Sequence, residues 1–254
     1  MQGKREEFDR LGFSIERGLL TSAECRAVLA HEKNESGVAP EPWAKARAAI
    51  DPFYHRLGAD ERFLALLRPL LGEDIVLWGA DLLLRAPGVV HPWHCDIESC
   101  GEDGGFVSIW IGLSHTNRKS ALNLVASSHK FGTTIQEQAH IHGLRRGEGT
   151  DADVVAWARS LDPATTLVAP KVGNGDAILF DGRLWHGSRN TRRYFSRTAI
   201  LLQYARADRA VRMFDPAHLE WPLRTRQDVL PPVVVVSGRA PEGLNAIVEA
   251  PLAS

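Results

Sequence analysis

Residues 75–84, IVLWGADLLL, decide the fold class of this chain. They open a series of short apolar runs, rich in β-branched and aromatic side chains, which Gly, Pro and Asn separate from one another. The later runs span residues 106–113, 122–126, 165–168, 177–180 and 196–204. Because short strands at this spacing, without intervening helices, are typical of antiparallel sheets, we predict a β-sandwich or barrel.

The regions around these runs have other patterns. The sequence TSAE at 21–24 resembles a capping box that opens a helix, and residues 61–71 repeat apolar side chains at helical spacing. A polar insertion at 131–163 contains one plausible helix, at 151–161, and is interpreted as a lid, a binding loop or a solvated loop. We predict one domain, 1–254, with a helical flank (1–74), a barrel (75–206) that includes the insertion, and a C-terminal extension (207–254).

The composition disfavours several classes of protein. With 30 Lys plus Arg against 31 Asp plus Glu, the net charge of -1 provides no global field that would gather nucleic acid or anionic membranes. No apolar run approaches the roughly 20 residues that span a bilayer, and residues 1–10 lack the apolar segment of a signal peptide. Cys25, Cys95 and Cys100 are an odd set without C-x-x-C spacing, which favours a reducing compartment. We therefore expect a cytoplasmic protein without nucleic-acid or membrane partners.

Residues 91–98, HPWHCDIE, contain the first candidate for a metal site. On an extended strand, His94 and Asp96 point to the same face. An imidazole and a carboxylate can bind adjacent positions of a first-row metal, and one His from another strand completes a 2-His-1-carboxylate triad with three positions open. An accidental pairing at a surface turn is the alternative, because the chain has 10 histidines.

The second half of the pattern is GDAILFDGRLWHGS at 175–188. A turn leads into a strand that ends near His186, and Arg197 follows eleven residues later in a β-patterned run. A guanidinium can pair with a carboxylate through two hydrogen bonds. The order His-x-Asp, distant His and Arg is what an iron enzyme with a dicarboxylate cosubstrate requires. For Arg197, a salt bridge on the barrel wall is the alternative, since other arginines lie close by in the sequence.

These motifs resemble the phytanoyl-CoA dioxygenase family of Fe(II)- and 2-oxoglutarate-dependent dioxygenases. The resemblance covers about residues 75–204 and is carried by WHCDIE at 93–98, IWIGL at 109–113, SSH at 127–129, GD at 175–176 and HGS at 186–188, followed by Arg197. The first of these stretches is similar to the Trp-His-Ser-Asp-Phe-Glu stretch of ectoine hydroxylases. The resemblance implies a mainly β fold with flanking helices: a double-stranded β-helix, or jelly-roll and cupin-like barrel, with N-terminal helices.

The resemblance also implies roles for single residues. Iron would be held by His94, Asp96 and His186, and the C5 carboxylate of 2-oxoglutarate by Arg197. Ser188, Trp110 and Ser108 would line the cosubstrate pocket. The implied reaction uses O2 to hydroxylate or otherwise oxidise a C–H bond of a small-molecule substrate, with release of succinate and CO2. Halogenating relatives carry a small residue in place of the carboxylate, so Asp96 favours hydroxylation.

Four further residues are weaker candidates for contact with the substrate. Glu98 continues the face of the two ligands, where it touches substrate, orients a ligand or forms an exposed salt bridge. His91 lines the pocket or supports a ligand. Arg145 and Arg146, in the insertion, attract an anionic substrate or are simply solvated.

Other functions remain open at this point. A cupin-like metal-binding or sensing protein without oxygenase turnover is the alternative, and it has no use for Arg197 with Ser188 in the barrel. A serine hydrolase is disfavoured because no Gly-x-Ser-x-Gly motif occurs. The family's usual Pro-Gly-Ser-His turn is ASSH at 126–129 here, and Ser120 takes the place of a Gly expected shortly before it, which implies altered loops near the substrate mouth. No motif identifies the substrate, and we expect a monomer or homodimer.

Overall fold

The computed structural model describes residues 2–35, 43–96, 98, 101, 103–215, 217–218 and 220–251. Ile97 of the HPWHCDIE motif and Cys100 lie outside the described residues. The strands are β1 (Phe13–Glu16), β2 (Ile75–Arg85), β3 (Val90–His94), β4 (Phe106–Ser114), β5 (Leu122–Val125), β6 (Leu167–Val168), β7 (Ala177–Asp181), β8 (His186–Arg189), β9 (Arg197–Arg206), β10 (Pro232–Ser237) and β11 (Ala246–Val248). The α-helices are α1 (Gln2–Leu11), α2 (Ser22–Glu35), α3 (Pro52–Gly58), α4 (Glu61–Leu71), α5 (Ile135–Ile141) and α6 (Asp151–Leu161), and short 3-10 helices are η1 (Arg47–Ala49) and η3 (Ser128–Lys130).

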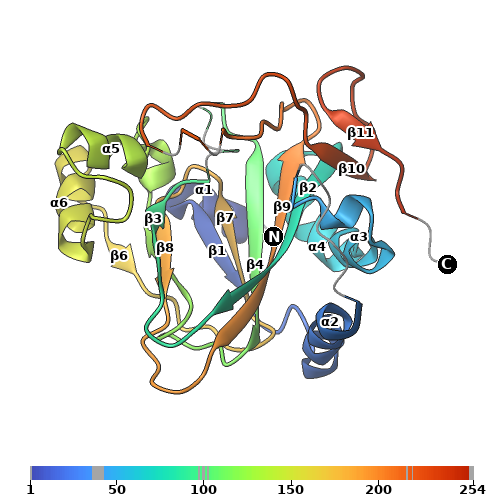
Figure 1. The fold of residues 1–254 in the computed structure, drawn as a ribbon, viewed down its shortest axis with the longest axis horizontal. Helices are drawn as coiled ribbons and strands as arrows, with labels where there is room; N and C mark the ends of the chain where they lie inside the picture. The colour runs from blue at the N-terminus through green and yellow to red at the C-terminus, as the bar shows by residue number, and fades with distance from the viewer. Residues whose placement is uncertain are drawn as a thin grey trace.

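Two β-sheets face each other and form the body of the molecule (Figure 1). The larger sheet has the strand order β1-β7-β4-β9-β2-β10-β11, and the smaller sheet has the order β3-β8-β5-β6. The consecutive strands from β2 to β9 supply four strands to each sheet, which is the arrangement of a jelly roll, or double-stranded β-helix. The predicted fold class, mainly β with N-terminal helices, is confirmed.

Helices cover the outer face of the larger sheet, where α2 and α4 both contact β4. Strand β4 is buried at every residue except its last, because its outer face packs on these helices and its inner face lines the barrel. The predicted capping box of α2 is confirmed by hydrogen bonds from the Thr21 N–H to the Glu24 carboxylate and from the Glu24 N–H to the Thr21 hydroxyl. The predicted helix at 61–71 is α4. Within the described ranges, no helix has both the length and the apolar character needed to cross a bilayer.

The insertion at 131–163 is a folded layer beside the smaller sheet (Figure 1). It contains the predicted helix, α6, and also α5, which the sequence pattern did not indicate. Apolar side chains of both helices, including Ile135 and Trp157, pack in one buried cluster with Trp185 of the barrel. The interpretation of this region as a solvated loop is therefore wrong.

Both ends of the chain add strands to the larger sheet. Strand β1 lies within the region predicted as a helical flank and pairs with β7. In the C-terminal extension, β10 pairs with the free edge of β2, and β11 runs parallel to β10. Between β9 and β10 the chain crosses the top of the barrel in Figure 1 toward α5 and returns. This crossing brings Phe214 to the wall of the central cavity.

Candidate metal centre

Three side chains meet inside the barrel at the start of the smaller sheet. His94 is the last residue of β3 and His186 the first of β8, and these two residues are direct partners in the antiparallel pairing. Asp96 follows two residues after His94, and its Oδ1 atom lies 3.7 Å from the Nε2 atom of each histidine. The three potential ligand atoms all lie within 4.8 Å of one another. The strand predicted through His94 and Asp96 ends at His94, because the Asp96 N–H donates to the Gly182 carbonyl instead of β8.

Both imidazoles are oriented for binding a metal through Nε2. The Nδ1 atom of His94 lies 2.9 Å from the Pro92 carbonyl oxygen, and that of His186 lies 2.9 Å from the Leu184 carbonyl oxygen. Because a carbonyl only accepts, each Nδ1 must carry the hydrogen, so each Nε2 presents its lone pair. Burial holds the pKa of His94 well below its usual value, which keeps this ring neutral.

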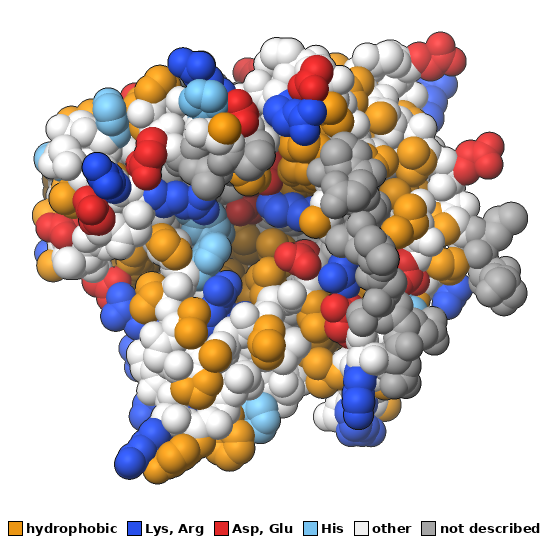
Figure 2. All heavy atoms as spheres, viewed as in Figure 1, with side chains coloured by type: hydrophobic (Ala, Val, Ile, Leu, Met, Phe, Trp, Pro, Cys, Tyr) orange, Lys and Arg blue, Asp and Glu red, His pale blue; other side chains and the backbone are white. Residues whose placement is uncertain are grey.

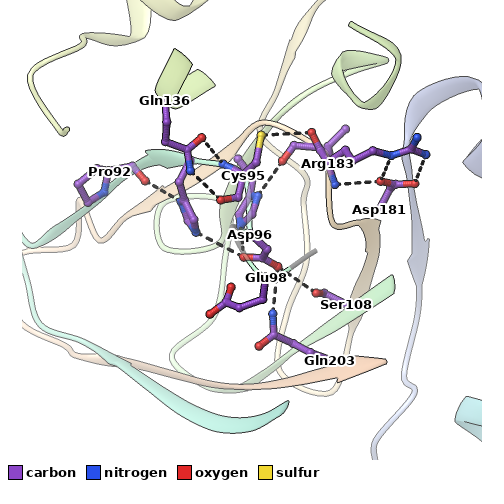
Figure 3. Close-up of polar contacts among 12 residues, drawn as sticks. Pro92, Cys95, Asp96, Glu98, Ser108, Gln136, Asp181, Arg183 and Gln203 are labelled. Atoms are coloured by element: carbon purple, nitrogen blue, oxygen red, sulfur yellow. Dashed lines mark hydrogen bonds and ion pairs between the residues drawn. The ribbon is translucent and has the colours of Figure 1, made fainter. Parts of the chain in front are cut away.

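Two donors hold the carboxylate of Asp96 by its other oxygen (Figure 3). Its Oδ2 atom accepts hydrogen bonds from the Ser108 hydroxyl at 3.1 Å and from the Gln203 side-chain amide at 3.0 Å. These bonds turn Oδ1 toward the histidines, so the geometry favours a carboxylate that binds through one oxygen. Ser108, predicted to line the cosubstrate pocket, thus makes its contact with Asp96. Gln203 was not singled out in the sequence, because it lies on β9 far from the metal motifs.

Gly79 makes room for this arrangement. It is the direct partner of Gln203 in the pairing of β2 with β9, and a Cβ atom there would lie 2.7 Å from Oε1 and 3.0 Å from Cβ of Gln203. We expect Gly79→Ala to displace the Gln203 amide from Asp96 and to weaken Fe(II) binding roughly tenfold. Loss of a residue that is hydrogen-bonded to a metal ligand commonly costs about 10–100-fold in metal affinity. Anaerobic metal titration measures this. Gly3→Ala, which meets no atom within 4 Å, is the control, and equal affinities in both variants would contradict the prediction.

A cavity of about 250 Å³ opens onto the three side chains. Figure 2 shows this face of the molecule hollowed between the two sheets, with histidine, acidic and basic side chains around the hollow. The predicted residues His91, Trp110, Arg146 and Ser188 all line the cavity, as do Arg85, Lys45 and Asp81. A second, larger cavity of about 830 Å³ shares Glu98 as a wall residue. We call the cavity at the candidate ligands the inner chamber and the larger cavity, which adjoins it at Glu98, the outer chamber.

Arg197 is 0% exposed and lies behind the wall of the inner chamber, where it contacts Leu83, Ser188 and Trp110, which line that chamber. Its guanidinium donates to the carbonyls of Ser120 and Leu83, approaches the Ser188 hydroxyl at 3.4 Å and lies over the Trp110 ring at 5.2 Å. Burial, aided by Arg85, lowers the pKa of Arg197 to about 10, so the group stays charged at neutral pH. Among the residues that the structure describes, these partners include no carboxylate. A buried cation of this kind suits an anion supplied from outside the chain.

Arg85 is a second cation, and it lines the inner chamber next to Arg197. It is the direct partner of Arg197 in the pairing of β2 with β9, so both side chains leave the same face of the sheet. Its Nε atom is buried without a hydrogen-bond partner among the described residues. In the sequence, Arg85 only follows the β-patterned run 75–84 and belongs to no motif. Its place beside Arg197 follows from the register between β2 and β9.

Glu98 forms an ion pair at the junction of the two chambers. Its carboxylate accepts from the Lys45 ammonium at 2.7 Å, and the Glu98 side chain is only 3% exposed. Lys45 also lies over the rings of Trp43 and Trp78, at 5.7 and 5.5 Å. Burial alone would lower the pKa of Lys45, but the carboxylates of Glu98 and Asp96 outweigh it and raise that pKa. Lys45 comes from the N-terminal flank and has no motif, so the sequence did not reveal it.

The remaining predicted residues lie at different distances from the centre. The His91 ring stands edge-on to His94 at 4.5 Å, and burial lowers the pKa of His91 to about 4, so it is neutral. Arg146 reaches the cavity wall, and its backbone N–H donates to Glu220. Arg145 lies on the exposed surface, where its backbone N–H donates to Glu148. The structure therefore brings His91 and Arg146 to the chamber and leaves Arg145 outside it.

Comparisons with known proteins agree with this architecture. A family model described as Phytanoyl-CoA dioxygenase (PhyH) matches residues 4–199. The ectoine dioxygenase of Sphingopyxis alaskensis is 29% identical over 168 residues, which are 61% of this chain and 55% of that protein. The chain thus spans little more than half the length of this curated relative.

Two solved structures share the fold. The epimerase SnoN in complex with Fe3+, alpha ketoglutarate and nogalamycin RO is 19% identical, with a TM-score of 0.61 over 83% of this chain and 85% of that chain. The non-heme monooxygenase ThoJ in its apo form is 18% identical, with a TM-score of 0.65 over 97% of this chain and 87% of that chain. At these identities the two structures bear on the fold alone, whereas the family model covers most of the chain. The chain belongs to the phytanoyl-CoA dioxygenase family, whose enzymes use Fe(II), 2-oxoglutarate and O2.

Proposed function

We propose that this chain is an Fe(II)- and 2-oxoglutarate-dependent dioxygenase that hydroxylates, or otherwise oxidises, a C–H bond of a small molecule. The observation that carries the proposal is the pairing of two features at one chamber. His94, Asp96 and His186 line it, and Arg197 lies directly behind its wall, against Ser188 and Trp110. Two imidazole nitrogens and one carboxylate oxygen suit a first-row metal and leave three positions open.

The proposal assigns roles to the residues around the metal and around the cosubstrate. His94 and His186 bind the metal through Nε2, and Asp96 binds through Oδ1 while Ser108 and Gln203 hold its other oxygen. Arg197 and Arg85 bind the distal carboxylate of 2-oxoglutarate. The Ser188 hydroxyl and the Trp110 ring complete that pocket. When bound, iron with 2-oxoglutarate and O2 supplies the oxidising chemistry, and 2-oxoglutarate leaves as succinate and CO2.

The position of the substrate follows from the two chambers. The metal ligands lie in the inner chamber, and the larger outer chamber meets it at Glu98. We place the reacting C–H bond at the inner end, with the rest of the substrate in the outer chamber near Glu98, His91 and Arg146. Hydroxylation, desaturation and cyclisation all begin with attack on such a bond. Epimerisation, the activity named for SnoN, is a further outcome of the same site.

The partners and compartment are proposed from the composition. A net charge of -1 gives the surface no overall attraction for nucleic acid or anionic lipid. We propose a cytoplasmic enzyme, a monomer or homodimer, that acts as one catalytic domain on a small molecule without nucleic-acid or membrane partners. The competing function is a cupin-like metal-binding or sensing protein without turnover.

Anaerobic titration with Fe(II) and 2-oxoglutarate tests the proposal. The expected result is a visible metal-to-ligand charge-transfer band, which forms only when the keto acid chelates the protein-bound iron. His94→Ala is expected to abolish the band because it removes one of three ligands. His142→Ala is the control, since that ring stacks on Trp157 in the insertion. Metal binding without the band would favour the metal-binding alternative.

A further inference from the structure

The insertion contacts the backbone between two of the metal ligands. The side-chain amide of Gln136 accepts a hydrogen bond from the Cys95 N–H at 3.1 Å and donates one to the Cys95 carbonyl at 2.9 Å. Cys95 stands between His94 and Asp96, and Figure 3 shows the amide facing it. One side chain therefore holds both backbone groups of the residue that separates two ligands.

The Gln136 contact lies where the chain leaves strand β3, and it supplies partners for backbone groups that the sheet no longer pairs. Strand β3 ends at His94, and the pairing of β3 with β8 is irregular between His91 and His94. Cys95 is only 1% exposed, and a buried backbone group without a partner costs about 1–3 kcal/mol. The Gln136 amide supplies one acceptor and one donor, as a neighbouring strand would. The backbone can then leave the sheet at the position that turns Asp96 toward the histidines.

The start of the helix that carries Gln136 is also held next to His186. Gln136 is 8% exposed and lies in the first turn of α5. Just before this helix, the Thr133 carbonyl accepts a hydrogen bond from the Trp185 indole at 3.1 Å, and Trp185 directly precedes His186. Ile135 packs in one buried cluster with Cys95 and Trp185. The start of α5 thus contacts the chain beside all three ligands.

We propose that Gln136 is a positioning residue of the metal centre, so that the insertion helps to set the ligand geometry. This inference rests on the proposed function, because it assumes that His94, Asp96 and His186 bind iron. Gln136 acts through the backbone of Cys95 and touches neither substrate nor metal. Loss of a partner that orients metal ligands commonly costs 10–100-fold in metal affinity.

Three variants separate positioning from simple packing. Gln136→Leu removes both hydrogen bonds, and Gln136→Glu in its ionised form keeps the acceptor for the Cys95 N–H but loses the donor to its carbonyl. Gln138→Leu is the matched control, because Gln138 is a buried glutamine of the same helix that donates to Thr133 instead of the ligand segment. Each variant is titrated with Co(II) and with Fe(II) under anaerobic conditions, and its melting temperature is measured without metal.

The expected result is a loss of Fe(II) affinity of roughly 10–100-fold in Gln136→Leu, with an altered Co(II) ligand-field spectrum. Gln136→Glu is expected to lie between this variant and wild type, and it provides the measurement if Gln136→Leu does not fold. Gln138→Leu is expected to bind metal as wild type does. Lower melting temperatures with unchanged Fe(II) affinity and Co(II) spectra in both Gln136 variants would overturn the role of Gln136 but not the proposed function. Failure of the wild-type protein to bind metal would overturn the proposed function as well.

Discussion

Asp96→Ala is expected to abolish 2-oxoglutarate turnover and to lower Fe(II) affinity by more than about 100-fold. Loss of a residue that is hydrogen-bonded to a metal ligand already lowers metal affinity by about 10–100-fold, and Asp96→Ala removes a ligand itself. It also leaves the Ser108 hydroxyl and the Gln203 amide, both buried, without the carboxylate oxygen that accepts from them. The free energy of unfolding is therefore expected to fall as well, by about 1–3 kcal/mol.

Two measurements separate these effects. Anaerobic titration gives the Fe(II) affinity, and thermal unfolding without metal gives the stability. Asp96→Asn keeps an oxygen in place but removes the charge, so it is expected to fold normally and still bind iron poorly. Asp81→Ala removes another carboxylate from the same chamber and is expected to keep the affinity of the wild type, since Asp81 is not in the ligand group. Equal affinity in Asp96→Ala and wild type would show that the metal is held elsewhere.

The fold could be predicted because the barrel strands carry their own local signal. Runs such as 75–84 and 106–113 are apolar and β-branched, and turn residues bound them, so local pattern and tertiary structure agree. Two residues of the candidate metal site could be grouped because His-x-Asp is a local motif, and the order of His-x-Asp, a distant His and an Arg added His186. Helix α5 was not predicted because it has only seven residues and most of them are polar. Its stability comes from packing on the barrel.

The residues around the candidate ligands could not be found in the same way. Gln136, Gln203 and Lys45 reach the site from the insertion, from β9 and from the N-terminal flank. A glutamine or lysine in such segments has no motif, and its role depends on which partner the strand register and loop packing bring within hydrogen-bond distance. Arg85 is similar, since only the pairing of β2 with β9 places it opposite Arg197.

Strand β10 shows another limit of the sequence. Residues 233–236 are four valines, a clear strand pattern, but nothing local indicates that they join the barrel. The free edge of β2 decides it, because unpaired backbone groups there accept a further strand. The extension thereby pairs with residues 75–77 of β2 and makes β11 the last strand of the larger sheet.

Arg197→Met is expected to weaken 2-oxoglutarate binding by about 2–5 kcal/mol, the cost of losing one partner of a buried charge pair. Fe(II) binding is expected to persist, because Arg197 is not one of the three candidate metal ligands. The free protein is expected to lose little stability, since wild-type Arg197 is a buried cation whose partners among the described residues are neutral. Removing such a charge relieves a desolvation cost, which offsets the lost hydrogen bonds to the Ser120 and Leu83 carbonyls.

The melting temperature with and without 2-oxoglutarate checks this prediction. A ligand that binds only the folded state stabilises it, so 2-oxoglutarate with Fe(II) should raise the melting temperature of the wild type under anaerobic conditions. The same addition should do almost nothing for Arg197→Met. Arg189→Met, which removes an exposed guanidinium paired with Asp151, should respond as wild type does. Arg85→Met distinguishes the two cations of the chamber. If it loses the response while Arg197→Met keeps it, Arg85 holds the distal carboxylate and the assignment of Arg197 is wrong.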